Sequence, residues 1–209
     1  MRSLVRSFAI LITLSLLTAC TSVTTNAPIG LSDGASLDTR LLGGWKAELE
    51  KGAPDEIYVF VLPRKKGGLQ ALVVAWKNDA VTMSPNDAEW WSSEIKTGKA
   101  GGHLFMNLRP LLKNGELDGD AAKLHEAGYF PLRYRVDADG RIELFIWRDA
   151  AAIKEAIRSG RISGTVDGED VRIKADARVD AFLAESAPVA FDALFATLIP
   201  LASSQTPAP

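Results

Sequence analysis

The sequence predicts a mainly β protein, namely a single antiparallel up-and-down β-barrel with two or three short α-helices. Apolar residues alternate with polar ones on both sides of the turn Asp137–Gly140, which indicates an antiparallel hairpin. Other strand-like runs follow one another at short intervals with turn residues between them. Successive hairpins favour an up-and-down order, and closure into a barrel removes exposed edges. Because the chain has one cysteine, core packing must hold this fold without an internal disulfide.

Four strands are expected in the first half of the chain. The first is β-branched and aromatic and stops at Pro63, and Gly67-Gly68 then turns the chain into the second. Gly101-Gly102 separates the third from the fourth, in which alternate apolar residues share one face. The expected strands cover 56–62, 69–76, 88–96 and 103–109.

The second half is expected to form two hairpins and two helices. Asp149 and Asp176 can each cap a helix, and Gly160 ends the first helix. Residues 188–201 allow two interpretations: a docking helix, or a short helix followed by a closing strand at 195–201. The expected hairpins pair 132–136 with 142–146 and 162–166 with 171–174, and the helices cover 150–159 and 177–185.

The first nineteen residues have the order of a secretory signal peptide. Arg2 and Arg6 precede an apolar run at 8–17, which is too short to cross a bilayer as a helix of about 20 residues. The ending Leu17-Thr18-Ala19-Cys20 resembles the lipobox of bacterial lipoproteins. That resemblance implies cleavage before Cys20 and acylation of its sulfur with fatty chains such as palmitate. Thr21 after the cysteine implies sorting to the outer membrane, on the side that faces the periplasm.

The expected organisation follows from that cleavage site and from composition. Residues 1–19 are the signal peptide, 20–40 a lipid-anchored flexible tether, 41–202 a single barrel domain and 203–209 a disordered tail. Since the signal peptide carries two arginines and no acids, 22 basic and 26 acidic side chains remain. This acidic balance argues against nucleic acid as a partner. The expected membrane contact is therefore the lipid on Cys20.

One short motif and several longer stretches resemble known families. Gly43-Gly44-Trp45 resembles the first-strand signature of lipocalins, whose tryptophan closes one end of the barrel. The other interpretation of Trp45 is a core side chain beside a tight turn. A broad group of uncharacterised bacterial lipoproteins with lipocalin-like barrels is similar over more of the chain, and it implies a fold without an activity. The similar stretches are 42–45, 99–108, 129–136 and 171–183.

Residues that could carry catalysis or bind metal are few. The sequence around His103 and His125 shows no metal-ligand spacing, and the chain has no second cysteine. Neither a metal nor a cofactor is therefore expected. Residues 114–120 space acidic groups like a calcium loop, but His125 stands where a bidentate glutamate is needed. A solvated loop is the simpler interpretation. A hydrolase with an unfamiliar site is the third hypothesis, because no known catalytic motif is present.

Aromatic residues on the strands are the main candidates for binding. The strand 142–147 is apolar on both faces near its end, so its outer face is either covered or binds something. The leading hypothesis is a non-enzymatic binding module that holds a small apolar or amphipathic ligand in the barrel. The alternative is an accessory lipoprotein with a packed barrel that contacts another envelope protein through Phe145 and Trp147. The candidate binding residues are Trp45, Trp76, Trp90, Trp91, Phe145 and Trp147.

Overall fold

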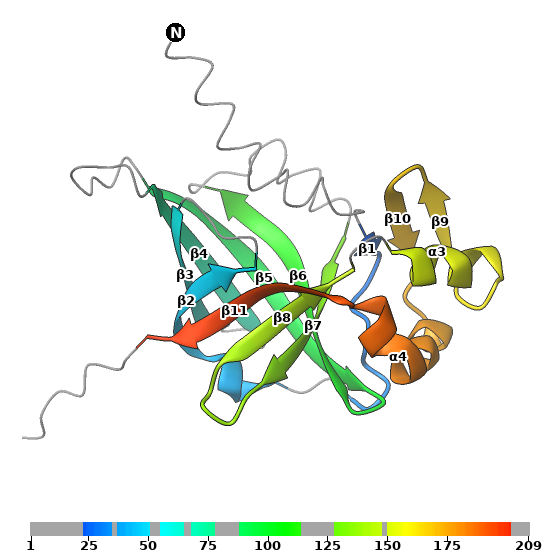
Figure 1. Ribbon diagram of the computed structural model, residues 1–209, viewed down its shortest axis with the longest axis horizontal. Coiled ribbons are helices and arrows are strands. Elements are labelled where there is room, and N and C mark those ends of the chain that lie inside the picture. Colours follow the sequence, from blue (N-terminus) through cyan, green and yellow to red (C-terminus); the bar gives the residue numbers. More distant parts are fainter. Residues whose placement is uncertain are drawn as a thin grey trace, which may run out of the picture.

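Eight antiparallel strands close into an up-and-down barrel in the computed structural model (Figure 1). From β2 to β8 each strand pairs with the next one along the chain, and β11 closes the barrel between β8 and β2. The predicted fold class is therefore confirmed. The structure describes residues 23–34, 37–50, 55–64, 68–77, 88–113, 128–147 and 150–201. The barrel strands are β2 (Gly43–Leu49), β3 (Asp55–Pro63), β4 (Leu69–Lys77), β5 (Ala88–Ala100), β6 (His103–Lys113), β7 (Phe130–Val136), β8 (Ile142–Ile146) and β11 (Ala193–Pro200).

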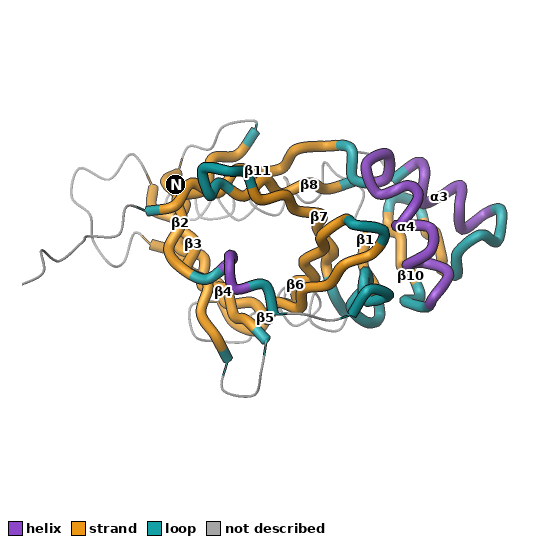
Figure 2. The backbone as a smooth tube through the Cα atoms, turned by 90° about the horizontal axis from the view of Figure 1, so that it is seen from below, coloured by secondary structure: helices purple, strands orange, loops and turns teal. Residues whose placement is uncertain are grey.

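A smaller unit packs against one side of the barrel. It is formed mainly by the chain between β8 and β11 and lies beside β7 and β8 in Figures 1 and 2. Its three-stranded sheet has the order β1-β10-β9, in which β1 runs parallel to β10. The elements are β1 (Val23–Thr25), α3 (Ala151–Arg158), β9 (Gly164–Asp167), β10 (Asp170–Ile173) and α4 (Ala177–Ala190).

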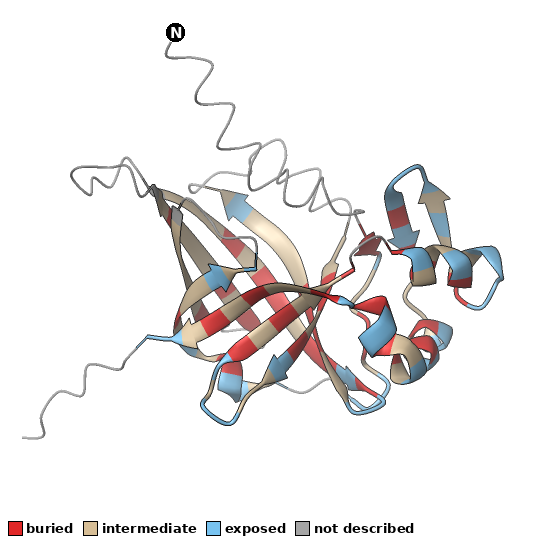
Figure 3. Ribbon diagram, in the orientation of Figure 1, coloured by how far each residue is buried: buried red, intermediate tan, exposed pale blue. Residues whose placement is uncertain are grey.

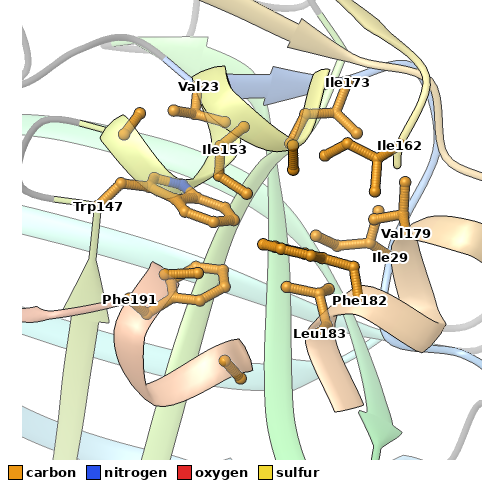
Figure 4. Packing of buried hydrophobic residues seen from close by; sticks show 14 of the residues in the cluster. Val23, Ile29, Trp147, Ile153, Ile162, Ile173, Val179, Phe182, Leu183 and Phe191 are labelled. Carbon is orange, nitrogen blue, oxygen red and sulfur yellow. The ribbon is translucent and has the colours of Figure 1, made fainter. Parts of the chain in front are cut away.

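The outer unit and the barrel have separate hydrophobic cores. The outer core fills the space between α3, α4, the small sheet and the outer face of the barrel (Figure 4). Its aromatic centre is Phe191, whose ring lies 3.8 Å from that of Trp147 and 5.6 Å from that of Phe105, measured between centroids. Burial of these rings explains why β8 can be apolar on both faces, since each face meets a different core.

Local sequence signals placed most elements correctly. The β7–β8 and β9–β10 hairpins form as expected, and Asp176 caps α4 by accepting hydrogen bonds from the backbone N–H groups of Arg178 and Val179. The helix continues past 185 to Ala190 and includes Pro188, because Ala187 and Ala190 are buried in the outer core. For residues 188–201, the closing strand of the second interpretation forms as β11 from Ala193, while the helical residues before it are the end of α4 and not a separate short helix.

One local expectation, the cap at the start of the first helix, differs from the structure. The N-cap of α3 is Ala150, in a left-handed conformation with φ of 53° and without a side-chain cap. Asp149, the expected cap, lies outside the described residues. Ala150 is 3 % exposed and belongs to the outer core, so tertiary packing decides where this helix begins.

The expected tether at 20–40 is wrong over the residues that the structure describes. Val23–Thr25 form the buried strand β1, and Ile29 is 1 % exposed. The short 3-10 helix η1 (Thr39–Leu41) follows. Backbone contacts hold the segment in place: Asp180 accepts hydrogen bonds from the N–H groups of Gly30 and Leu31, at 2.6 and 2.9 Å. The described part of this segment is therefore folded from Val23 onward, and the polar composition of residues 23–34 conceals a few deeply buried apolar residues.

Candidate binding site inside the barrel

The inner wall of the barrel is lined mainly by apolar side chains, as strand register requires. On neighbouring strands, directly paired residues point to the same face of the sheet. Val59 pairs with Val73 and Val61 with Ala71, and Val73 in turn pairs with Trp91. The inner core contains Trp45, Val61, Leu69, Ala71, Ile95, Met106, Leu132, Tyr134, Ile142, Leu144, Ala196 and Leu198.

The two ends of the barrel differ in how far these inner side chains are buried. We call the end where β3 begins and β6 ends the mouth, which is the upper end in Figure 1, and the opposite end the floor. Near the floor, Val61, Leu69 and Ile95 are at most 3 % exposed. The inward residues Ile57, near the mouth, and Val73, midway along β4, are only half-buried, whereas the small side chain of Ala75 beside Ile57 is buried. Figure 3 shows intermediate exposure along the mouth ends of β3 and β6.

The helix η1 closes the floor. Leu41 on η1 is 1 % exposed and Trp45 is 5 % exposed, and the indole Nε1–H of Trp45 donates to the carbonyl of Leu41 at 3.1 Å. Asp38 caps η1 by accepting from the N–H of Arg40, and the hydroxyl of Tyr134 donates to Asp38 Oδ2 at 2.7 Å. Trp45 therefore belongs to the plug of the barrel floor.

The hydrogen bonds at the floor shift two pKa values. Burial raises the pKa of Tyr134 far above its ordinary value, and the hydrogen bond to Asp38 adds to the rise. Partial burial would raise the pKa of Asp38, but hydrogen bonds from Arg40 and Tyr134 outweigh it and lower that pKa. The ionised carboxylate of Asp38 is thus the form that holds the plug against β7.

Acid is expected to destabilise the protein by protonating Asp38 at the barrel floor. A carboxyl group whose pKa is lowered on folding stabilises the protein above its unfolded pKa of about 3.9, and this contribution is lost as pH falls through the folded pKa. The variant Asp38→Asn should be less stable than the parent at pH 7, by about 1.5 kcal/mol. The difference should shrink toward pH 3, as urea denaturation followed by tryptophan fluorescence can measure. An undiminished difference at low pH would contradict this role.

A charged pair lies among the inward side chains at the mouth. Glu89 pairs with inward Ala75, and Lys113 pairs with inward Trp91. Lys113 Nζ lies 3.9 Å from Glu89 Oε2 and 5.9 Å from the centroid of the Trp91 ring. An apolar wall below one aromatic ring and a charged pair is complementary to an amphipathic molecule.

Sequence reasoning missed both charged residues of the mouth. Glu89 could have been found, because it lies an even number of positions from the inward residues Trp91 and Ile95 on the same strand and so points to the same face. By simple alternation along β6, Lys113 would point to the outer face of the barrel. It reaches the inner face only because the register with β5 shifts between Ser92 and Ser93. Such a bulge leaves no clear signal in the sequence.

The structure brings only two of the six candidate binding residues into the barrel, Trp45 at the floor and Trp91 near the mouth. Trp76 and Trp90 lie on the outer wall, where Trp76 meets Tyr58 edge-on with centroids 5.7 Å apart. Phe145 lies under the guanidinium of Arg133, at 4.1 Å. Trp147 is 4 % exposed in the outer core and offers no surface to a ligand or partner, which corrects its expected role.

Other candidate groups contribute little to the site. His103 is partly buried at the start of β6, while His125 and the acidic segment 114–120 lie outside the described residues. Within the described ranges, no three His, Cys, Asp or Glu side chains gather where they could hold a metal ion. Nor does any helix of this part of the chain have the length and apolar character to cross a membrane.

Comparison of the chain with known protein families, curated proteins and solved structures finds no significant match.

Proposed function

We propose that this chain is a lipid-anchored protein of the bacterial envelope whose barrel binds a small apolar or amphipathic molecule without transforming it. The observation that carries the binding role is the unequal burial of the inner wall. The floor is plugged by η1 and Trp45, whereas Ile57 near the mouth and Val73 midway along β4 keep accessible surface. Accessible apolar surface on an inner wall gains free energy when a ligand covers it, at about 25 cal/mol per Å².

Membrane attachment is the second part of the proposal, and it is supported by the sequence. The run of apolar residues at 8–17 and the lipobox-like ending at Cys20 are typical of lipoproteins that are acylated after export. Two or more acyl chains bind a membrane stably, where one binds only marginally. Thr21 favours the outer membrane, with the domain in the periplasm.

Filling the inside of the barrel at Val73 should weaken ligand binding. The half-buried side chain of Val73 points inward, so Val73→Phe would occupy space that a ligand needs. We expect it to weaken binding of a dansyl-labelled undecanoic acid by about tenfold or more, roughly 1.4 kcal/mol. The measurement is a fluorescence titration of the chain from Thr21 onward, produced without lipid.

The matched control is Val74→Phe, because Val74 is the next residue, is also half-buried and points to the outer face. It should bind the probe like the parent. Equal binding by the parent and both variants would place the probe outside the barrel. A parent that binds no apolar probe and yields no lipid on extraction would refute the binding function.

Removing the sulfur of Cys20 tests the anchor. Since Cys20 is the sole cysteine, Cys20→Ala should give either an uncleaved precursor or an exported protein in the soluble fraction. Cell fractionation followed by mass spectrometry of the amino-terminal peptide measures both outcomes. A variant that stays with the outer membrane in the parent's amount would contradict the anchor.

A second candidate function is recognition of another envelope protein. The outer wall of β3 and β4 favours it, since Tyr58 and Trp76 meet there and Leu62 is 55 % exposed. Aromatic side chains are enriched at protein interfaces. Cross-linking in cells separates the two functions, because a stable protein adduct without bound lipid favours this one.

A further inference from the structure

The described chain begins at the mouth end of the barrel. Two backbone hydrogen bonds join Thr25 and Tyr129, from Thr25 N–H to the Tyr129 carbonyl at 2.9 Å and from Tyr129 N–H to the Thr25 carbonyl at 2.8 Å. Tyr129 immediately precedes β7, which runs from the mouth to the floor. In Figure 1, β1 correspondingly lies beside the upper end of β7.

This attachment is close and specific. A Cβ atom at Gly128 would lie 2.2 Å from the Thr25 carbonyl oxygen, so only glycine lets the two segments approach this far. On its other side β1 pairs with β10, and Val23, Thr24 and Thr25 are at most 4 % exposed. The position of β1 relative to the barrel is therefore fixed by buried contacts.

Chain length then limits where Cys20 can be. It precedes Thr25 by five residues, which span at most about 18 Å when fully extended. The nine-residue strands β3 and β4, tilted as in other barrels, span about 23 Å along the barrel axis. A lipid on Cys20 is consequently held near the mouth and cannot reach the level of the floor.

We propose that the mouth of the barrel faces the membrane and that the molecule in the barrel is a lipid whose acyl chain enters directly from the bilayer. This inference rests on the proposed acylation of Cys20. The chemistry of the mouth suits that position. Trp91 and Lys113 belong to the residue types that lie at the level of lipid headgroups, where an aromatic ring or a long cationic side chain has one apolar and one wet end. Below them, the apolar inner wall continues the hydrocarbon environment of an acyl chain.

The orientation can be tested with two single-cysteine variants of the full acylated protein. Leu112→Cys places a thiol on the outer face at the mouth end of β6, and Ala138→Cys places one in the turn between β7 and β8 at the floor. Both positions are exposed, and acylation removes the natural thiol from reaction with the probe. Each variant is labelled with a fluorophore and incorporated into phosphatidylcholine–phosphatidylglycerol vesicles that carry a headgroup spin label.

The fluorophore at 112 is expected to be quenched several-fold more strongly than the one at 138. Equal quenching, or stronger quenching at 138, would overturn the orientation. This measurement does not need a ligand in the barrel, so it can succeed even where the binding function fails. Protein that does not float with the vesicles would instead refute the anchor and, with it, the orientation.

The occupant is tested separately on protein purified from its membrane. Organic extraction and mass spectrometry should find a bilayer lipid in stoichiometric amount with the parent and with Val74→Phe, and a large loss with Val73→Phe. A lipid that remains in Val73→Phe in the parent's amount, or a parent without lipid, would overturn the assignment of the occupant while leaving the orientation result in place.

Discussion

Asn107→Ala is expected to lower the free energy of unfolding by about 3 kcal/mol. The Asn107 side chain is fully buried between the barrel and the segment that follows β1. Its Oδ1 accepts from the N–H of Ile29 at 2.9 Å, and its Nδ2 donates to the carbonyls of Ile29 and Lys96 at 3.0 and 3.3 Å. Alanine would leave both backbone groups of Ile29 buried without partners, and each such group costs about 1–3 kcal/mol.

Urea denaturation followed by tryptophan fluorescence measures this loss. The control is Gln70→Ala on the outer wall of β4, where a half-buried amide makes no side-chain hydrogen bond to the described residues. It should change the unfolding midpoint little. Gly98→Ala provides an independent check, since its Cβ would lie 2.2 Å from the carbonyl oxygen of Gly30 in the same segment. If Asn107→Ala and Gln70→Ala had equal effects, the segment 26–31 would not contribute to stability through this contact.

Glu94→Gln is also expected to lower the free energy of unfolding, by about 2–4 kcal/mol. The Glu94 side chain is 7 % exposed and lies between three cations: Arg64 at 2.7 Å, Lys96 at 3.2 Å and Arg109 at 2.9 Å. Burial would raise the pKa of Glu94, but the hydrogen bond from Lys96 and the charges of the cations outweigh it and lower that pKa. Glutamine would leave these cations next to one another without the central negative charge.

Solvent weakens this repulsion, because the side chains of the three cations remain 31–39 % exposed. The loss should therefore grow at low salt and shrink at high salt. Asp139→Asn is the control, because it removes an ion pair with Arg141 in which both side chains are more than half exposed. It should leave the urea midpoint unchanged. A salt-independent loss in Glu94→Gln would contradict an electrostatic origin.

Signals carried by neighbouring residues predicted the barrel well. Alternation around the turns at 137–140 and 167–168 placed four strands, and Asp176 located the start of α4. Such signals succeed because side-chain period and turn conformation depend on residues only a few positions apart. Alternation along the strands also indicates which residues line the inner wall, and it places both Trp91 and Glu89 there.

Contacts between distant parts of the chain could not be predicted. The expected tether turned out to contain β1 and η1, because Asn107 and Asp180 bind its backbone from positions 78 and about 150 residues away. The sequence left open whether the face with Trp147 is covered or binds something, and the structure shows it packed against Phe191. The role of Lys113 depends on one shifted residue in the pairing of two strands.

The sequence by itself determined that the chain forms a disulfide-free antiparallel barrel, since alternation, turns and the single cysteine are all local or countable properties. Only the tertiary structure decided which end of that barrel is plugged, which side chains meet at its mouth and where the amino-terminal segment is attached. These features arise from hydrogen bonds and packing between residues far apart in sequence, whose partners become known only when the chain has folded.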